Sequence, residues 1–319
     1  MPLDLFPTPE CVHWGFFDGT LPPVAEIASG DVVTIHTVSG GTEDLPPDGR
    51  GMTVRPEHRR ILAAVEPGPG PHIMTGPIAV RGAEPGDALR VEILEVSLRD
   101  DWGFNLIRPG AGALPDLVPD LAPGGGRIHL PIDRARGVIQ MPWGLEIPAR
   151  PFFGVIGTAP PPADGQLTSI VPGAFGGNID NKELTAGAVL HLPVWTAGAL
   201  LSVGDGHAAQ GDGEVCLTAV ETGLTGRFRV ELVKGAGLAG PWAETADHVI
   251  TMGFDPDLDE AARIALRAMI ALISGRTGLS AEEAYRLCSV AADLRVTQLV
   301  NRHKGIHALL PRWALHGAS

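Results

Sequence analysis

The amino-acid sequence predicts a mainly β protein, sandwich-like or barrel-like, with a C-terminal α+β portion. Glycine contributes 42 and proline 29 of the 319 residues, and this loading favours many turns over long helices. Two runs near the N-terminus, residues 32–38 and 89–96, have the composition of strands, whereas a clear helical pattern occurs only after residue 245. Because 44% of the residues are hydrophobic, a chain of this length can bury a large core.

The strand-like runs each follow a tight Gly-Asp turn. Residues 32–38 are rich in β-branched side chains, and residues 89–96 alternate apolar and polar side chains. Farther along, residues 185–190 are echoed by residues 196–201, and this eleven-residue offset is typical of short strands in a sandwich or barrel. We therefore expect antiparallel strands joined by turns throughout residues 1–245.

The C-terminal part, residues 246–319, has a different pattern. Apolar residues recur there at a spacing of three or four, which predicts an amphipathic helix, and Ser280 to Glu283 form a capping-box motif that would begin a second helix. The predicted elements are a helix at 257–274, a helix at 280–291, a strand at 294–300 and a strand at 305–310. We therefore divide the chain into a β-rich domain at 1–245, which would carry the active site, and an α+β portion at 246–319 packed on it.

The charge balance excludes several classes of partner. The chain has 24 Lys and Arg against 37 Asp and Glu, a formal net charge of −13, which disfavours binding to nucleic acid or to anionic membranes. The start of the chain has no signal-peptide pattern, and no apolar run is long enough to span a membrane, so we expect a cytoplasmic protein. Three scattered cysteines provide neither a disulfide framework nor a Cys-x-x-Cys metal site. A mean hydropathy of +0.14 indicates apolar surface, and we expect a homodimer or a higher homo-oligomer.

Side chains that suggest chemistry are concentrated in residues 204–214. The four candidates are Asp205, His207, Asp212 and Glu214. Residues two apart share one face of a strand, so these side chains would converge on one pocket if residues 201–207 and 212–219 were neighbouring strands. An Asp/His/Glu set suits Zn²⁺ or another divalent ion, and carboxylates alone would suit Ca²⁺. The alternative is a polar surface hairpin in which the Gly-Asp pairs only turn the chain.

A second polar segment surrounds Asn178 and Asp180. The chain has only four asparagines, and two of them lie within this glycine-rich stretch. We predict Asp180 as a metal ligand, although an ordinary Asn/Asp-rich loop is the alternative. His72 and Trp14 are candidate contacts for a substrate, or else residues with a purely structural role. We interpret Cys216, in Val-Cys-Leu, as a small buried residue and not as a nucleophile.

Seven stretches, taken in order, resemble the acetamidase/formamidase family. They are His13-Trp14 and residues 75–87, 101–105, 153–157, 176–180, 204–214 and 290–311. The most specific of them is the Gly-Asp-x-His-x-x-Gln-Gly-Asp-Gly-Glu string at 204–214. The resemblance implies a mainly β fold with a C-terminal α+β portion. It also implies hydrolysis of short aliphatic amides to a carboxylate and ammonia, with a bound divalent metal that is zinc or, in some members, calcium. The chain is less similar to the longer formamidases because it lacks room for their insertions.

This resemblance leads to a set of expected roles. The expected metal ligands are Asp180, Asp205, His207 and Glu214. Glu214 or Asp212 would transfer protons between the water and the leaving ammonia. The expected substrate contacts are His72, Asn178 and Trp14. Asn178 or backbone N–H groups of the glycine-rich turn would stabilise the oxyanion, and His72 would hold the substrate or complete the metal shell. Two alternatives stay open: hydrolysis of another C–N bond, in a cyclic amide, ureide or carbamate, and a non-catalytic β-sandwich that binds a metal and a sugar.

Overall fold

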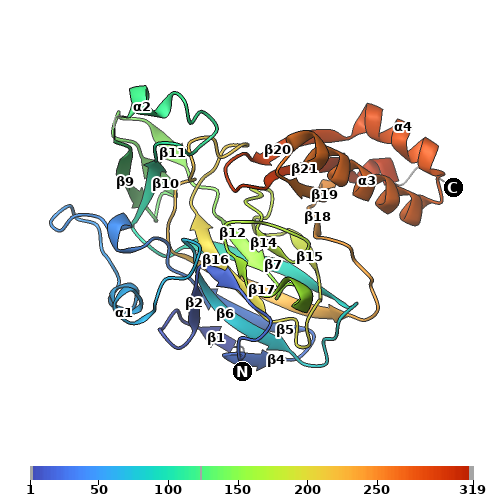
Figure 1. Cartoon of the computed structure of the whole chain (residues 1–319), viewed down its shortest axis with the longest axis horizontal. Helices are drawn as coiled ribbons and strands as arrows, with labels where there is room; N and C mark the ends of the chain where they lie inside the picture. Colours follow the sequence, from blue (N-terminus) through green and yellow to red (C-terminus); the bar gives the residue numbers. More distant parts are fainter. Residues whose placement is uncertain (1–2, 123, 316–319) are drawn as a thin grey trace.

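Two β-sheets packed face to face form the main body of the protein (Figure 1). The computed structural model describes residues 3–122 and 124–315. The larger sheet has nine strands, in the spatial order β1 (Leu3–Leu5), β5 (Asp31–His36), β17 (Leu224–Val233), β7 (Ala88–Leu98), β15 (Val189–Pro193), β18 (Trp242–Glu244), β19 (His248–Asp255), β21 (Lys304–Pro311) and β20 (Asp293–Gln298). Its neighbouring strands are antiparallel, apart from β1 and β5.

The second sheet carries the residues that matter most below. Its order is β14 (Gly176–Asn178), β12 (Phe152–Gly157), β16 (Leu201–His207), β6 (Ile73–Val80) and β2 (Val12–Trp14), with β4 (Ala25–Ile27) pairing in parallel with β6. A four-stranded sheet lies beside it, in the order β11 (Glu146–Pro148), β10 (Val138–Gln140), β9 (Gly126–Asp133) and β8 (Trp102–Ile107). A small pair joins β13 (Leu167–Thr168) to β3 (Phe16–Phe17).

Helices occupy little of the chain outside its C-terminal part. The described α-helices are α1 (Pro56–Ala64), α2 (Val118–Leu121), α3 (Leu258–Thr277) and α4 (Ala281–Ala291), and the short 3-10 helices are Thr42–Asp44, Pro162–Asp164 and Arg312–Leu315. No single helix in the described parts of the chain is long and apolar enough to cross a membrane. Only α3 and α4 taken together meet that criterion of length and composition, and they are bent by 114°.

The core lies between the inner faces of the two large sheets. Phe228 of β17 and Phe153 of β12 meet across the interface, with ring centroids 5.6 Å apart. Val33 of β5 and Val203 of β16 are fully buried in the same cluster. The alternating and β-branched patterns of the sequence thus supply one inward face from each sheet, which confirms the predicted mainly β class.

The C-terminal helices cover the far end of the larger sheet (Figure 1). On α3, Ala265 and Met269 are fully buried in one cluster with Val249 of β19. The sheet itself is continuous across residue 245, because β18 and β19 are hydrogen-bonded neighbours. The proposed division into residues 1–245 and 246–319 therefore falls inside one sheet, and it stays a prediction.

Local signals in the sequence explain how both helices begin. The Asp257 side chain accepts hydrogen bonds from the first N–H groups of α3, and Ser280 forms the predicted capping box with Glu283 at the start of α4. The first helix ends later than predicted, at Thr277, because Gly278 and not Gly275 adopts the left-handed conformation, with φ of 77°.

The interpretation of residues 212–219 as a strand beside residues 201–207 was wrong. Residues 212–219 form turns, and Gly213 makes only an isolated bridge to Gln298. The strand β16 is instead bridged at His207 by Glu221, farther along the chain. The glycines at 211 and 213 and the left-handed φ of 46° at Glu214 turn the chain before any strand can form.

Candidate functional site

Four carboxylates and one histidine meet at the end of β16, and all five side chains are buried. They are Asp180, Asp205, His207, Glu214 and Glu221. Strand β16 supplies Asp205 and His207, and Asp180 follows β14, which lies on the far side of β12 from β16. The sheet thus brings together residues that are far apart in the sequence.

The backbone departs from regular strand geometry at three of these residues. Asp180, Asp205 and Glu214 have φ values of 51°, 53° and 46°. A left-handed conformation at a residue other than glycine costs roughly 1–3 kcal/mol, and such residues cluster at functional sites. The backbone strain at these residues lowers the stability of the fold, and it orients the three carboxylates.

His207 is at the centre of the cluster. Its Nε2 atom lies 3.1 Å from Asp205 Oδ2, 3.2 Å from Glu221 Oε1 and 3.9 Å from Asp180 Oδ1. On the other side of the ring, Nδ1 lies 2.9 Å from Gln210 Oε1, while Gln210 Nε2 donates to the carbonyl oxygen of Asp180. Because the Gln210 oxygen can only accept, Nδ1 donates its proton, and Nε2 faces the carboxylates.

Burial and mutual repulsion shift the acidity of the cluster. Burial, together with the Asp205 charge, raises the pKa of Asp180 to about 7 and that of Glu221 to about 8. Burial is the largest cause that raises the pKa of Glu214 well above its usual value, and the charge of Asp180 is the second. Burial opposes the charged form of His207, but Glu221 and Asp205 outweigh it and raise the pKa of the ring. The protein thus needs positive charge at this point, from protons or from a cation.

The chemistry of the donors fits a divalent cation. Two overlapping groups have ligand atoms within 4.8 Å of one another: Asp180, Asp205 and His207, and His207, Glu214 and Glu221. Three carboxylate oxygens, one each on Asp180, Glu214 and Glu221, are buried without a hydrogen-bond partner. Such atoms are costly unless a cation or water satisfies them. The buried Asp/His/Glu cluster can therefore hold a metal ion, and nitrogen with oxygen donors suits zinc among others.

A glycine makes room for this arrangement. A Cβ atom at Gly154 of β12 would lie 2.6 Å from Asp205 Oδ2 and 2.7 Å from the His207 ring, and it would also overlap Asp180. Both distances are well below ordinary contact, so any larger residue would displace the cluster. The Gly154 carbonyl also accepts a hydrogen bond from the backbone N–H of Asp180.

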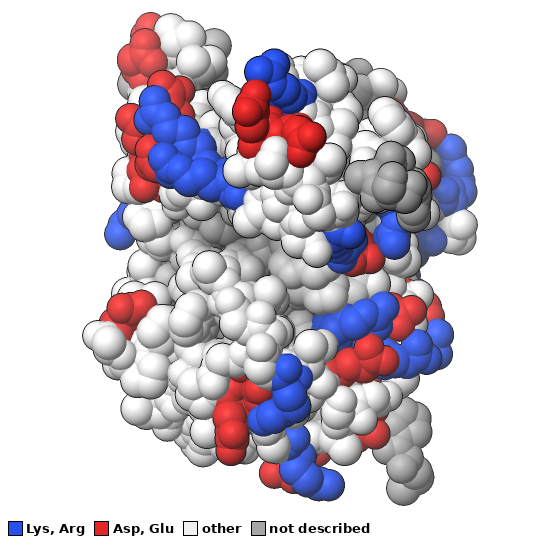
Figure 2. Space-filling model, turned by 90° about the vertical axis from the view of Figure 1, so that its right-hand side faces the viewer, with Lys and Arg blue, Asp and Glu red and all other residues white. Residues whose placement is uncertain are grey.

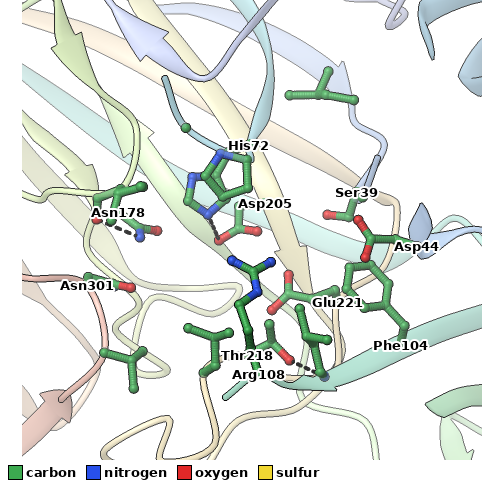
Figure 3. Close-up of a pocket in the computed structure, with 18 of the residues that line it drawn as sticks. Ser39, Asp44, His72, Phe104, Arg108, Asn178, Asp205, Thr218, Glu221 and Asn301 are labelled. Carbon is green, nitrogen blue, oxygen red and sulfur yellow. Dashed lines mark hydrogen bonds and ion pairs between the residues drawn. The ribbon is translucent and has the colours of Figure 1, made fainter. Parts of the chain in front are cut away.

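The four carboxylates of the cluster line a cavity of about 410 Å³ (Figure 3). His72 lines it, with Nε2 3.7 Å from Asp205 Oδ2 and Nδ1 2.9 Å from the Ser169 hydroxyl. Burial lowers the pKa of His72, which favours a neutral ring. Asn178 also lines the cavity, and its amide donates to the Ile170 carbonyl while its own side-chain oxygen lacks a partner.

Two residues proposed from sequence lie elsewhere. Asp212 pairs with Lys182 at 3.1 Å and does not line the cavity. Trp14 packs behind the wall, against Ile61 and Ile73, and its indole N–H donates to the carbonyl of Pro71. Neither side chain reaches the cluster, although both adjoin segments that do.

Sequence reasoning missed two residues of the site. Glu221 is a direct neighbour of His207, and its only signal was a lone carboxylate after the largely apolar residues 215–220. Asn301 donates a short hydrogen bond to Asp180 Oδ2, and its signal was the scarcity of asparagine in the chain. Both side chains come from segments that the sequence gives no reason to place near β16.

Comparison with known proteins identifies the family. The Acetamidase/Formamidase family model matches residues 17–163 and 162–312. The chain is 30% identical to an acetamidase of Mycolicibacterium smegmatis and 31% identical to a formamidase of Methylophilus methylotrophus, over 51% and 45% of its own length. It spans only about half of those relatives, 54% and 47% of their lengths.

A solved structure extends the likeness to the whole fold. The crystal structure of an acetamidase from Bacillus halodurans superposes with a TM-score of 0.85 and 32% identity, covering 99% of this chain and 100% of that one. Since the family model spans nearly all of the sequence as well, the chain belongs to the acetamidase/formamidase family.

Proposed function

We propose that this protein hydrolyses short linear amides to a carboxylate and ammonia, with the help of a divalent metal. The observation that carries the proposal is the cluster of unsatisfied carboxylates around His207 at the floor of a cavity. The names of the relatives, acetamidase and formamidase, support the same reaction. Zinc is the first candidate because the donor set contains an imidazole, and calcium is the second because the remaining donors are carboxylates.

The cluster residues would divide into ligands and a proton carrier. Asp180, Asp205 and His207 would hold the metal. A divalent ion at this place supplies a Lewis acid for the amide carbonyl and lowers the pKa of water. Gln210 fixes the ring of His207, and Asn301 fixes the carboxylate of Asp180, so both ligands are oriented before any ion arrives.

Glu214 is the proposed proton carrier. Amide hydrolysis needs a base that takes a proton from water and then protonates the departing nitrogen, because ammonia leaves poorly as its anion. The Glu214 carboxylate lines the cavity and has one oxygen without a partner. Asp212 is the second candidate, and its ion pair with Lys182 makes it the weaker one. Glu221 also lines the cavity with one unpartnered oxygen, but its other oxygen lies 3.2 Å from His207 Nε2, so we place it with the residues around the ring and not as the proton carrier.

Substrate would be held by the walls above the cluster. His72 offers a ring nitrogen beside Asp205, and Asn178 offers its amide group for the developing oxyanion. Trp14 would act from behind, by supporting the segment that carries Pro71 and His72.

The experiment combines metal analysis with turnover. Purified protein should contain a divalent metal by mass spectrometry, and it should release ammonia from formamide, acetamide or propanamide. A chelator should abolish the release, and addition of Zn²⁺ or Ca²⁺ should restore it. Metal-loaded protein that releases no ammonia from any linear amide would refute the proposal. Release only from a cyclic amide, a ureide or a carbamate would move the activity to that bond, and sugar binding without turnover would make the protein a binding module.

We also propose that the protein assembles as a homodimer or a larger homo-oligomer. Several large apolar side chains are more than half exposed, including Trp143, Tyr285, Val290 and Trp313. Figure 2 shows broad uncharged surface between separate groups of charged residues on the side of α3 and α4. A stable monomer of about 33 kDa in light scattering at micromolar concentration would contradict this proposal.

A further inference from the structure

The cavity is much larger than a short aliphatic amide requires. Its volume of about 410 Å³ falls within the range of roughly 300–1,000 Å³ that is usual for sites of drug-sized ligands. Acetamide would fill only a small part of it. Apolar side chains line the space above the cluster, among them Phe104, Leu106 and Leu217. The cavity therefore has room for a longer acyl chain.

Arg108 adds a cation to this space. The residue directly follows β8, and Figure 3 shows its side chain entering the cavity and directing the guanidinium toward the acidic cluster. Within the described residues, its guanidinium makes no ion pair or hydrogen bond. The other arginine of the lining, Arg127, is already paired with Asp44 at 2.6 Å.

The position of Arg108 is set by its backbone neighbours. The carbonyl of Arg108 accepts a hydrogen bond from the N–H of Ala111, and the N–H of Ala113 donates to the carbonyl of Val215. The loop that carries Arg108 is thus tied to the segment that carries Glu214. These bonds hold the backbone of Arg108 at the cavity wall, while its side chain is exposed.

From the size of the cavity and the unpaired guanidinium of Arg108, we infer that the preferred substrate is an amide whose acyl chain carries a carboxylate, which Arg108 binds. This inference rests on the proposed amide hydrolysis and specifies its substrate class. A guanidinium binds a carboxylate through two parallel hydrogen bonds, and this geometry is specific to planar anions. A cationic amide would be repelled by Arg108, and a small neutral amide would leave the guanidinium unpaired and the apolar wall uncovered.

The test compares amides of matched length and different charge. The substrates are succinamate, which is anionic, butanamide, which is neutral, and 4-aminobutanamide, which is cationic. In the metal-loaded wild-type protein, kcat/KM should be highest for succinamate. A glutamine at position 108 can keep one of the two hydrogen bonds. In Arg108→Gln the ratio of kcat/KM for succinamate to that for butanamide should therefore fall about 10- to 100-fold, the effect of losing the other hydrogen bond to a charged group. In Arg108→Glu the preference should shift to 4-aminobutanamide.

A matched control removes the same charge elsewhere. Arg263 lies on α3 and pairs with Glu260, so Arg263→Gln should leave the ratio unchanged. An unchanged ratio in Arg108→Gln would overturn the inference. An equal loss for both substrates would also overturn it, because Arg108 would then act as a counter-ion of the cluster and not as a specificity residue.

The two proposals can fail separately. Ammonia release from butanamide without any preference for succinamate would leave amide hydrolysis standing and would reject the role of Arg108. If no amide is hydrolysed, the proposed function fails, and calorimetry with succinamate then decides the inference on its own. Weaker binding in Arg108→Gln than in wild type would support an anion site, and equal binding would reject it.

Discussion

Replacing Gly154 by alanine tests whether the cluster around His207 is the functional centre. The added Cβ would lie 2.6 Å from Asp205 Oδ2 and 2.7 Å from the His207 ring, whereas ordinary contact begins at 3.4 Å. The two groups must therefore retreat by about 0.8 Å and about 0.7 Å. A misplacement of roughly 1 Å at a reacting centre can cost about 10²-fold in rate, so we expect kcat to fall by about that factor and metal content to fall with it.

The expected cost in stability is smaller. Overpacking a buried site costs about 1–3 kcal/mol, and the loss of glycine's freedom in the unfolded chain returns about 0.4–1 kcal/mol. The free energy of unfolding, measured in urea with metal removed, should therefore decrease by no more than about 3 kcal/mol. The variant should stay folded while its site is damaged.

Gly226→Ala is the matched control for this variant. A Cβ at Gly226 of β17 would lie 2.5 Å from ring atoms of both Phe153 and Phe228, so it overpacks the core between the sheets. It should lose a similar free energy of unfolding and keep its metal. Metal content and ammonia release near wild type in Gly154→Ala would refute the assignment of the site. Equal losses of metal in both variants would attribute the effect to general destabilisation.

Three further predictions concern the carboxylates. Glu214→Gln should lower kcat about 10²–10⁴-fold with metal content near wild type, and a parallel loss of metal would make Glu214 a ligand instead. Asp212→Asn should change turnover less than twofold or so, because Asp212 pairs with Lys182 outside the cavity, and a loss equal to that of Glu214→Gln would move the proton transfer to Asp212. Removal of metal should lower Tm more at pH 8 than at pH 6. Burial raises the pKa of Asp180 to about 7 and of Glu221 to about 8, so the metal-free folded state binds these protons more tightly than the unfolded chain does. It consequently loses stability as pH rises toward 8, and a loss of Tm that is the same at both pH values would contradict this reasoning.

Features encoded by near neighbours in the chain could be predicted from sequence. The strand at 32–38 corresponds to β5, and the capping box at Ser280 begins α4. These elements depend on side-chain alternation, turns and caps, each of which involves residues only a few positions apart. For the same reason the strands at 294–300 and 305–310 were found as β20 and β21.

The tertiary structure alone decided how the site is assembled. Asp205 and His207 stand out in the sequence because one short segment holds both, but Glu221 joins them through a chain reversal that replaced the predicted strand at 212–219. Asn301 reaches Asp180 across 121 positions of sequence. Contacts of this kind depend on how the sheets pack and where each strand ends. Patterns of neighbouring residues in the sequence determine neither of these. The same holds for the acidity of the cluster, since a carboxyl group acquires a raised pKa only when folding removes its water and brings other carboxylates beside it.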